Sequence, residues 1–242
     1  MSATSTKPSS NPASKQDAGA IDVLEALLAA RYSCRAYKSD QVPRSVIERI
    51  VTTAQRTASW CNSQPWHATI FSGAETDRFR TAMYTAASSG GDAPTDFPWP
   101  REYRDVYLQR RRESGFQLYD AVGIPKGDRA AGAKQALENF KFFGAPHVAI
   151  ITTTEPLGVY GAVDCGAYVA NFMLAAQALG VGSIAQAALA RRPDVIREYL
   201  KLPADRLVVC GISFGYPAHD APINSYRTSR APLSEAVTFV GE

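Results

Sequence analysis

Apolar residues recur every three or four positions in several stretches of the chain, and this spacing places them on one face of an α-helix. One stretch, "AVDCGAYVANFMLAAQALGVG", is apolar almost all round and contains many small residues. A helix of this kind is buried, often against a copy of itself. The predicted helices cover residues 21–31, 43–54, 101–124, 134–144, 162–182 and 193–202.

Two continuous apolar runs, residues 147–153 and 206–215, predict buried strands because they are rich in β-branched residues. A shorter strand is predicted over residues 67–73. Helices and strands alternate without the regular βαβ rhythm of a doubly wound sheet. The chain is therefore predicted to form one α+β domain over residues 21–242, after a disordered tail of Ser, Thr, Pro and Ala at residues 1–20.

Residues 87–132 differ from the rest of the chain. A loop rich in helix breakers, "SSGGDAPTDFPWP", precedes a predicted helix that carries many charges. The segment is too short for a core of its own, so we interpret it as an excursion from the main domain. Its aromatic residues fit the lining of a pocket and the core of the excursion's own helices equally well: Trp99, Tyr103, Tyr107, Phe116 and Tyr119.

Composition excludes several classes of function. The chain has 242 residues, of which 45% are hydrophobic and 20% charged, with a formal net charge of +3. This small surplus favours an anionic small molecule over a nucleic-acid surface. We expect no membrane-spanning run and no secretory or transit segment. The four cysteines and three histidines are scattered without metal-ligand spacing, which indicates reduced thiols in a cytoplasmic protein.

Two short segments combine arginines with hydroxyl groups. "RYSCR" places Arg31 and Arg35 around Ser33, and "SYRTSR" forms a second cluster at residues 225–230. Two guanidinium groups and a hydroxyl suit a phosphate dianion. The alternative, favoured for either segment alone, is a solvated helix end whose arginines complement the helix dipole.

"GVGSIA", residues 180–185, has the G-x-G-x-x-A spacing of a dinucleotide-binding turn. That turn requires a strand before it and a helix after it, so that a pyrophosphate meets the helix N-terminus. Here a predicted helix comes first. We therefore interpret the glycines as a helix stop before a strand.

The segment "SWCNSQPWHA", residues 59–68, places three side chains that hydrogen-bond in two directions directly before a proline and a tryptophan. This pattern indicates a rim of amides held beside a rigid aromatic turn. The chain has no Ser-His-Asp order, acidic pair or H-E-x-x-H motif that forms a complete catalytic set. If the protein is an enzyme, a cofactor is expected to carry the chemistry.

Read in order, five segments resemble the FMN-dependent nitroreductase family: "RYSCRAY", "SWCNSQPWHA", "NFKFFGAPHVAI", "DCGAYVANFMLAAQALGVGS" and "NSYRTSRAPLSE". Together they cover most of residues 21–235. The excursion's "QRRRESGFQLYDAVGIPKGD" resembles the branch of nitrobenzoate and other nitroaromatic reductases. The resemblance implies a mixed β-sheet flanked by helices in an intertwined homodimer, with FMN at the subunit interface.

The resemblance also implies which residues hold the flavin. The "RYSCR" and C-terminal arginines fall on phosphate-binding positions, and Arg227 stands beside Thr228, where relatives often carry a basic residue. The N-x-Q-P-W loop borders the isoalloxazine ring, "SIAQAA" supplies backbone N–H groups near N5, and a lysine lies near the pyrimidine edge. No catalytic acid–base residue and no metal ligand is implied. The predicted FMN-binding residues are Arg31, Tyr32, Ser33, Arg35, Asn62, Gln64, Lys141, Gln186, Ala187 and Arg230.

The implied activity is NAD(P)H-dependent reduction of nitroaromatic compounds to hydroxylamines by a two-electron ping-pong mechanism. Two alternatives remain open at this point. The same fold supports other flavin reactions, namely quinone reduction, flavin fragmentation and dehalogenation. A nonenzymatic flavin carrier or sensor would bind FMN that NAD(P)H barely reduces.

Overall fold

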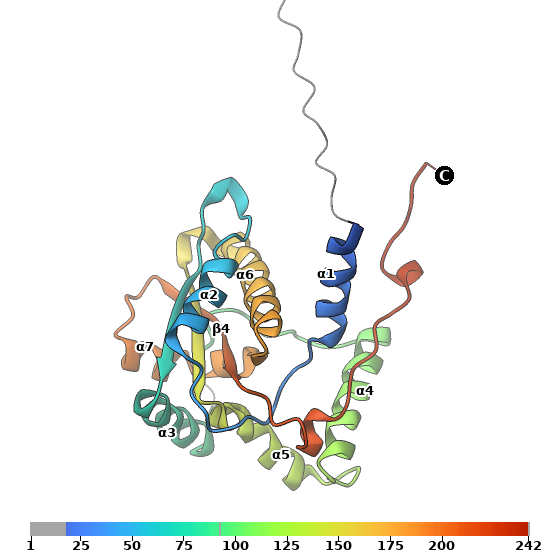
Figure 1. The fold of residues 1–242 in the computed structure, drawn as a ribbon. Helices are drawn as coiled ribbons and strands as arrows, with labels where there is room; N and C mark the ends of the chain where they lie inside the picture. The colour runs from blue at the N-terminus through green and yellow to red at the C-terminus, as the bar shows by residue number, and fades with distance from the viewer. Residues whose placement is uncertain (1–17, 92, 242) are drawn as a thin grey trace, which may run out of the picture.

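A four-stranded antiparallel sheet lies at the centre of the computed structural model, which describes residues 18–91 and 93–241 (Figure 1). The strands are β1 (His67–Ser72), β2 (His147–Thr154), β3 (Gly182–Gln186) and β4 (Arg206–Gly215). The helices are α1 (Ala18–Ala30), α2 (Arg44–Ala54), α3 (Ala74–Ser88), α4 (Asp105–Ala121), α5 (Arg129–Leu137), α6 (Gly158–Ala178) and α7 (Pro193–Leu200). The predicted α+β class is confirmed.

The order of the strands is β1-β2-β4-β3, and each neighbouring pair is antiparallel. The expectation of a mixed sheet is therefore wrong for the strands of the described chain. β2 and β3 run in the same direction and are connected by α6, but β4 comes later in the sequence and lies between them. Within the described residues, parallel pairing is confined to an isolated bridge between Ser33 and Ser183.

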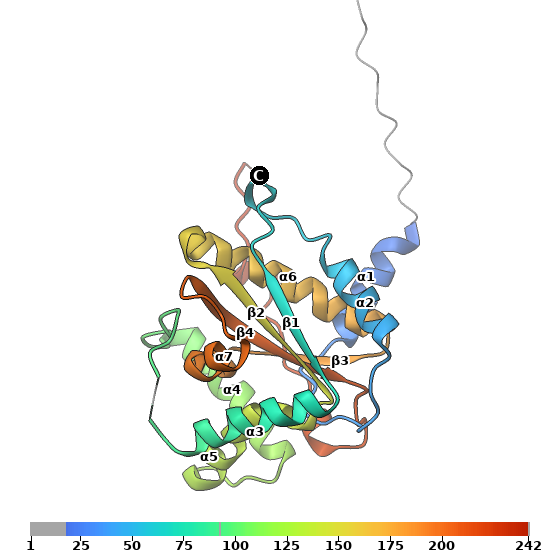
Figure 2. The same cartoon turned by 90° about the vertical axis from the view of Figure 1, so that its left-hand side faces the viewer.

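The two faces of the sheet carry two separate cores, because successive side chains of a strand point to opposite faces. Ala149 and Ile151 pack with α2 and α6 on one face, whereas Val148 and Ile150 pack with α3 and α7 on the other. Figure 2 shows α6 and α2 above the sheet and α3, α5 and α7 below it. Because the strand order is β1-β2-β4-β3, β1 and β3 are the two edges of the sheet.

The three predicted strands agree with the structure to within one residue at each end. α3 was not predicted, although Phe79 and Met83, four residues apart, are both fully buried on it. The predicted helix over residues 134–144 breaks, because α5 ends at Leu137 and a 3₁₀ segment, Glu138–Gly144, follows. In that segment Phe142 and Phe143 have positive φ angles of 57° and 52°. Consecutive non-glycine residues rarely adopt this conformation, and sequence periodicity gives no sign of it.

The predicted limits of the N-terminal tail need one correction. α1 begins at Ala18, so the helix starts before the expected boundary at residue 21. Residues 1–17 lie outside the described part of the chain. In the excursion, Trp99, Tyr103, Tyr107 and Phe116 are between 41% and 66% exposed, and α4 has no buried residue. These four aromatic residues therefore do not form an internal core.

The glycine stop after α6 is confirmed. Gly180 has φ 72°, its N–H donates to Gln177 O at 3.1 Å, and Val181 N–H donates to Ala176 O at 2.9 Å. These two bonds form the Schellman arrangement that closes a helix before the chain enters a strand. The stretch Glu155–Ala178 is long and apolar enough to cross a membrane by length and composition alone. Its Cys165, Phe172 and Ala176 belong to the sheet's core, which explains that apolar character.

His147, at the start of β2, connects the sheet to the segment before α2. Its ring is 1% exposed, and Nε2 accepts a hydrogen bond from Val42 N–H at 2.9 Å. Nδ1 therefore carries the proton and faces Ser72 Oγ at 2.8 Å. Burial lowers the pKa of His147, because an imidazolium cation would lose its hydration there.

This burial makes folding stability depend on pH. The unfolded histidine takes up a proton near pH 6.5, whereas the folded one resists it until a lower pH. Stability is therefore complete above about pH 6.5 and is lost as the pH falls through the folded pKa. We expect His147→Gln to flatten the decline in urea midpoint between pH 7 and pH 5.5. The same substitution at exposed His219 is the control, and an unchanged decline in His147→Gln would contradict this account.

Candidate functional site

The "RYSCR" segment lies along the open edge of β3. Cys34 N–H donates to Ser183 O at 3.1 Å, next to the parallel bridge between Ser33 and Ser183. Further along, Lys38 N–H donates to Tyr216 O at 2.8 Å. The segment that leaves α1 is thereby fixed between the edge of the sheet and the chain that follows β4.

Asn224 joins this segment to the C-terminal part of the chain. Its side chain is buried, with 3% exposure, and Oδ1 accepts from Arg35 N–H at 2.8 Å. Nδ2 donates to Ala36 O and to Ala218 O, each at 2.9 Å. A single amide thus satisfies three backbone groups from two segments that are about 180 residues apart in sequence.

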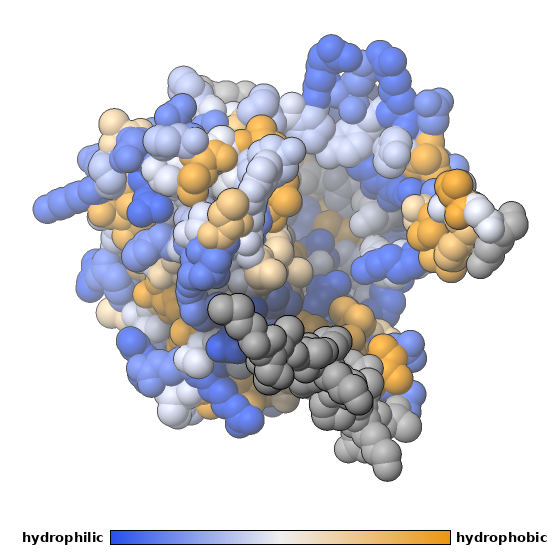
Figure 3. Space-filling model, turned by 90° about the horizontal axis from the view of Figure 1, so that it is seen from above, coloured by the Kyte–Doolittle hydropathy of each residue, from blue (hydrophilic) through white to orange (hydrophobic). Residues whose placement is uncertain are grey.

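The two arginine clusters, which the sequence presents separately, meet at one cavity of about 280 Å³. Seen from above, the molecule is hollowed between the main body and the projecting segments, and hydrophilic residues gather there (Figure 3). Ser114 extends to the cavity from α4, so the excursion contributes to its wall. The lining consists of Leu28, Ala29, Arg31, Tyr32, Ser33, Arg35, Ser114, Tyr226, Arg227, Thr228 and Arg230.

The positive charge of this cavity is not balanced by the protein. Arg35 Nη1 donates to Tyr226 Oη at 2.8 Å, and Arg230 Nη1 donates to Ser229 O at 2.9 Å. Arg227 lies with Cζ 3.7 Å from the centre of the Tyr32 ring. Within residues 18–91 and 93–241, no carboxylate forms an ion pair with any of the four lining arginines.

Two pKa values reflect this environment. Burial, and then the nearby charge of Arg230, lower the pKa of Arg31. Burial raises the pKa of Tyr32 to about 12, so its ring stays neutral beneath the Arg227 guanidinium. A cluster of like charges with hydroxyl donors beside it is suited to a bound anion with several oxygens. The donor set therefore fits a phosphate dianion.

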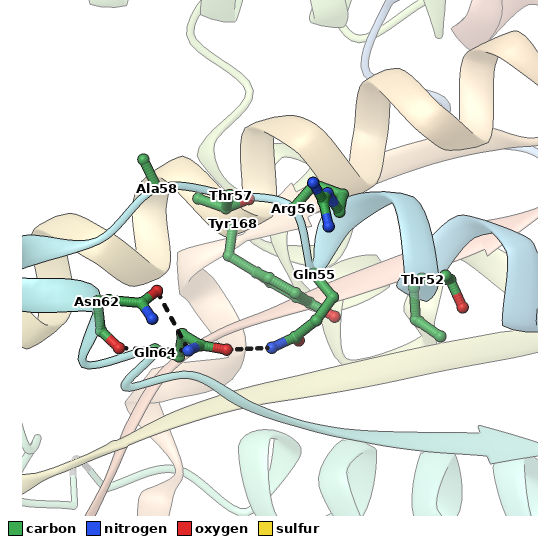
Figure 4. Close-up of a pocket in the computed structure, with 9 residues that line it drawn as sticks. Thr52, Gln55, Arg56, Thr57, Ala58, Asn62, Gln64 and Tyr168 are labelled. Carbon is green, nitrogen blue, oxygen red and sulfur yellow. Dashed lines mark hydrogen bonds between the residues drawn. The ribbon is translucent and has the colours of Figure 1, made fainter.

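A second, larger cavity of about 790 Å³ lies between the end of α2 and the "SWCNSQPWHA" loop. Asn62 and Gln64 line it together with Gln55 and Tyr168 (Figure 4). The loop is tightly bent, because Cys61, Asn62 and Gln64 all have φ near 50°. Few non-glycine residues tolerate that conformation unless their surroundings fix it.

Three contacts hold this bent loop. Gln64 N–H donates to Ser59 Oγ at 2.9 Å, and Trp60 N–H donates to Asp164 Oδ2 of α6 at 3.2 Å. Trp66 is 8% exposed and stacks on Tyr168, with ring centres 5.1 Å apart. Trp66 thereby fixes the loop against the core, as expected for a rigid aromatic turn.

One chain does not bring all the predicted residues together. The arginine cavity and the amide-lined cavity share no lining residue. Lys141 belongs to neither, since Nζ pairs with Glu138 Oε1 at 2.8 Å and lies 4.8 Å from the Tyr84 ring centre. Hydrogen bonding to Glu138 raises the pKa of Lys141, so the amine is a firm cation.

Gln186 and Ala187 lie at the end of β3, close in sequence to the bridge at Ser183. The Gln186 side chain is buried and fully used, because Nε2 donates to Asn139 O at 2.9 Å and Oε1 accepts from Ser213 Oγ. Only its backbone is left for a ligand, as the family pattern implies, and exposed Ala187 follows it.

Sequence reasoning missed four residues of these sites. Asn224 and Tyr226 stand in "INSYR" without a distinguishing pattern, and Ser114 lies on a charged helix that could face in any direction. Gln55 is an ordinary polar residue after α2. One signal was available for Tyr226, since it lies within the predicted arginine cluster at residues 225–230.

The family model described as "Nitroreductase family" matches residues 28–216, which is most of the chain. Among similar proteins, Nitroreductase NfnB of Mycolicibacterium smegmatis is 36% identical over 217 residues, covering 89% of this chain and 92% of that protein. A 4-nitrobenzoate reductase of Nocardioides sp. is 32% identical, covering 91% of each. The chain belongs to the nitroreductase family.

Solved structures agree with this assignment. The crystal structure of the FMN-dependent nitroreductase NfnB from Mycobacterium smegmatis in complex with NADPH has a TM-score of 0.86 and 34% identity. It covers 91% of this chain and 99% of its own. An FMN and NADPH-dependent nitroreductase NfnB from sphigopyxis sp. strain HMH has the same TM-score at 29% identity, covering 90% and 99%.

The junction at Asn224 can be tested by its stability. Asn224→Ala leaves Arg35 N–H without its acceptor and removes one hydrogen bond each from Ala36 O and Ala218 O, which keep Ala218 N–H and Ala221 N–H as partners. We expect a loss of about 1–3 kcal/mol in the free energy of unfolding. Asn224→Asp keeps the acceptor for Arg35 N–H but places an oxygen against two carbonyl oxygens, so it should also destabilise. Urea denaturation checks both variants, with Asn139→Ala as a control on a more exposed amide. Wild-type stability in Asn224→Ala would refute the role of the junction.

Proposed function

We propose that this protein is an FMN-dependent oxidoreductase that uses NAD(P)H to reduce nitroaromatic compounds to hydroxylamines. The observation that carries the proposal is the convergence of two arginine clusters on one cavity, where no carboxylate of the described residues forms an ion pair with them. The names of the similar proteins, which include nitrobenzoate and nitrobenzene reductases, support the substrate class.

FMN fits the residues that are present. The phosphate of FMN carries two negative charges, which would balance the arginines that line the cavity. Ser33 and Ser114 add hydroxyl donors. The cavity of about 280 Å³ holds a phosphate and part of the ribityl chain but not a whole flavin. The ring would therefore lie outside this cavity, where the backbone of Gln186 and Ala187 at the end of β3 could contact it.

A second copy of the chain would complete the site. The amide-lined cavity is separate from the arginine cavity within one chain, and both reach the surface. Large apolar side chains are exposed on α1, on α6 and in the C-terminal segment, as with Val159 at 72% and Phe239 at 67%. In Figure 1, α1 and the C-terminal segment project from the body of the fold. A homodimer would bury these surfaces and place one copy's Asn62 loop at the other copy's arginine cavity.

The protein's contribution to the reaction is binding, orientation and electrostatics. When bound, FMN supplies two-electron transfer from NAD(P)H to an acceptor, with the two substrates using the site in turn. The arginine clusters would hold the phosphate, and Lys141, which is paired with Glu138, would supply a cation toward the pyrimidine edge. The exposed aromatic residues of the excursion, such as Trp99 and Phe116, offer flat surfaces against which a nitroaromatic ring can pack.

The location proposed is the cytoplasm. All four cysteines are free thiols, with Cys34 and Cys165 buried, and nothing in their environment calls for an oxidising compartment. Reduced nicotinamide cofactors, the proposed electron donors, are also cytoplasmic metabolites.

The first test is the visible spectrum of the purified protein under anaerobic conditions. Flavin bands that bleach with NADPH or NADH and return when 4-nitrobenzoate is added would support cofactor, donor and acceptor together. Bands that persist with both donors would refute the reductase and favour a flavin carrier. Loss of the flavin itself on reduction would favour flavin fragmentation. Bands restored by a benzoquinone but not by any nitroaromatic would favour quinone reduction.

The role of the arginine cavity can be separated from that of the ring. Riboflavin lacks the phosphate, so the ratio of riboflavin to FMN dissociation constants measures what the phosphate contributes. A charged hydrogen bond contributes about 1.5–3 kcal/mol, so Arg31→Gln or Arg230→Gln should lower this ratio by about tenfold to hundredfold. Arg112→Gln, at an exposed position of α4 that does not line the cavity, is the matched control. If the ratio is unchanged in both cavity variants, the phosphate is bound elsewhere.

A further inference from the structure

A continuous hydrogen-bond chain runs from buried Trp66 through three side chains that line the amide-lined cavity. Trp66 Nε1 donates to Gln55 Oε1 at 3.0 Å, and Gln55 Nε2 donates to Gln64 Oε1 at 2.9 Å. Gln64 Nε2 then lies 3.2 Å from both Asn62 O and Asn62 Oδ1. The last links of this chain are drawn as dashed lines in Figure 4.

The hydrogen-bond chain runs in one direction from donor to acceptor, and the Trp66 indole sets that direction. The Nε1–H of a tryptophan can only donate, so Gln55 must turn its carbonyl oxygen toward Trp66. Its NH₂ group then faces Gln64 and requires an oxygen there. Gln64 in turn presents its NH₂ group to the oxygens of Asn62. Each amide is thereby oriented by the one before it, starting from a ring that is buried and stacked on Tyr168.

We propose that Gln55 is a positioning residue that transmits this direction, so that Asn62 offers an N–H donor to the ligand. With Oδ1 occupied by Gln64, Nδ2 is the free end of the Asn62 amide. The proposal rests on the proposed function, in which the ligand is a flavin ring. The matching ligand atom is a hydrogen-bond acceptor, a carbonyl oxygen or an unprotonated ring nitrogen. An N–H group of the flavin ring would not bind opposite Asn62 Nδ2, because two donors would face each other.

The same geometry changes the expected role of Gln64. Its carbonyl oxygen accepts from Gln55 and its NH₂ group faces Asn62, so its side chain supports Asn62 and does not face the ligand. The left-handed backbone at Asn62 and Gln64 brings the two amides onto the same side of the loop. Gln55, the C-cap residue of α2, directly follows Ala54, the last residue of that helix, and its backbone N–H donates to Val51 O. The direction of the chain is thus anchored at both Gln55 and Trp66.

An isosteric substitution at position 55 should reverse the direction of the hydrogen bonds between Gln55, Gln64 and Asn62. Gln55→Glu keeps an acceptor for Trp66 but replaces the donor toward Gln64 by a second acceptor. Gln64 would have to turn its NH₂ group toward position 55, and Asn62 would turn its NH₂ group toward Gln64. The oxygen of Asn62 would then face the acceptor atom of the ligand. We expect FMN binding to weaken at least tenfold, measured by flavin fluorescence titration of the full-length protein stripped of its flavin.

Two controls make this result specific. Thr52→Glu places a carboxylate in the same cavity one helical turn before Gln55, outside the hydrogen-bond chain. It should weaken FMN binding much less than Gln55→Glu. In an Asn62→Ala background, Gln55→Glu should cause no further loss, because its effect passes through Asn62. The proposal would be overturned if Thr52→Glu weakened FMN binding as much as Gln55→Glu. It would also be overturned if Gln55→Glu caused its full loss of FMN affinity in the Asn62→Ala background.

A measurement without flavin separates this inference from the proposed function. In the stripped protein, the side-chain amide protons of Gln64 should show nuclear Overhauser contacts to Asn62. In Gln55→Glu these contacts should move to the side chain at position 55. Failure of the parent protein to bind FMN would refute the proposed function alone. If the nuclear Overhauser contacts of Gln64 are the same in the parent protein and in Gln55→Glu, the fixed direction of the hydrogen-bond chain is refuted, whether or not FMN binds.

Discussion

The junction between the segment after α1 and the segment after β4 is the constraint on which the site depends. Asn224 satisfies three backbone groups across it, and the bridge at Ser33 ties it to the edge of β3. Four guanidinium groups at one cavity give a density of donors that neither arginine cluster reaches alone. The junction supplies that density by aligning two segments that the sequence keeps far apart. The fold therefore produces the anion site, and the arginines alone do not.

This arrangement has an energetic cost that a ligand removes. Arg31 and Arg230 repel each other, and burial further lowers the pKa of Arg31. A ligand that binds only the folded state stabilises it in proportion to the logarithm of its concentration over its dissociation constant. A dianion at this cavity would both offset the repulsion and add charged hydrogen bonds. Cofactor binding and stability of the C-terminal segment are thus coupled through the same few guanidinium groups.

The class of fold and the local motifs could be predicted from the sequence. Features that depend on contacts between residues far apart in the chain could not. Strands such as β2 were predictable because burial on both faces demands an uninterrupted apolar run. The break after Leu137 was not, because the positive φ angles of Phe142 and Phe143 are imposed by packing. The arginine clusters were visible as motifs, but their convergence depends on Asn224, whose neighbours in sequence give no indication of its role.

The two halves of the site recognise their ligand by different physical means. The arginine cavity acts through net charge, which is non-directional, so its members can be recognised by residue type alone. The amide-lined cavity acts through direction, since an asparagine is a donor or an acceptor depending on what its other end contacts. That direction begins at Trp66 Nε1 and passes through Gln55 before it reaches Gln64 and Asn62. In the proposed site, charge would fix where an anionic cofactor is held, whereas the amide chain would determine which edge of its ring can face the loop.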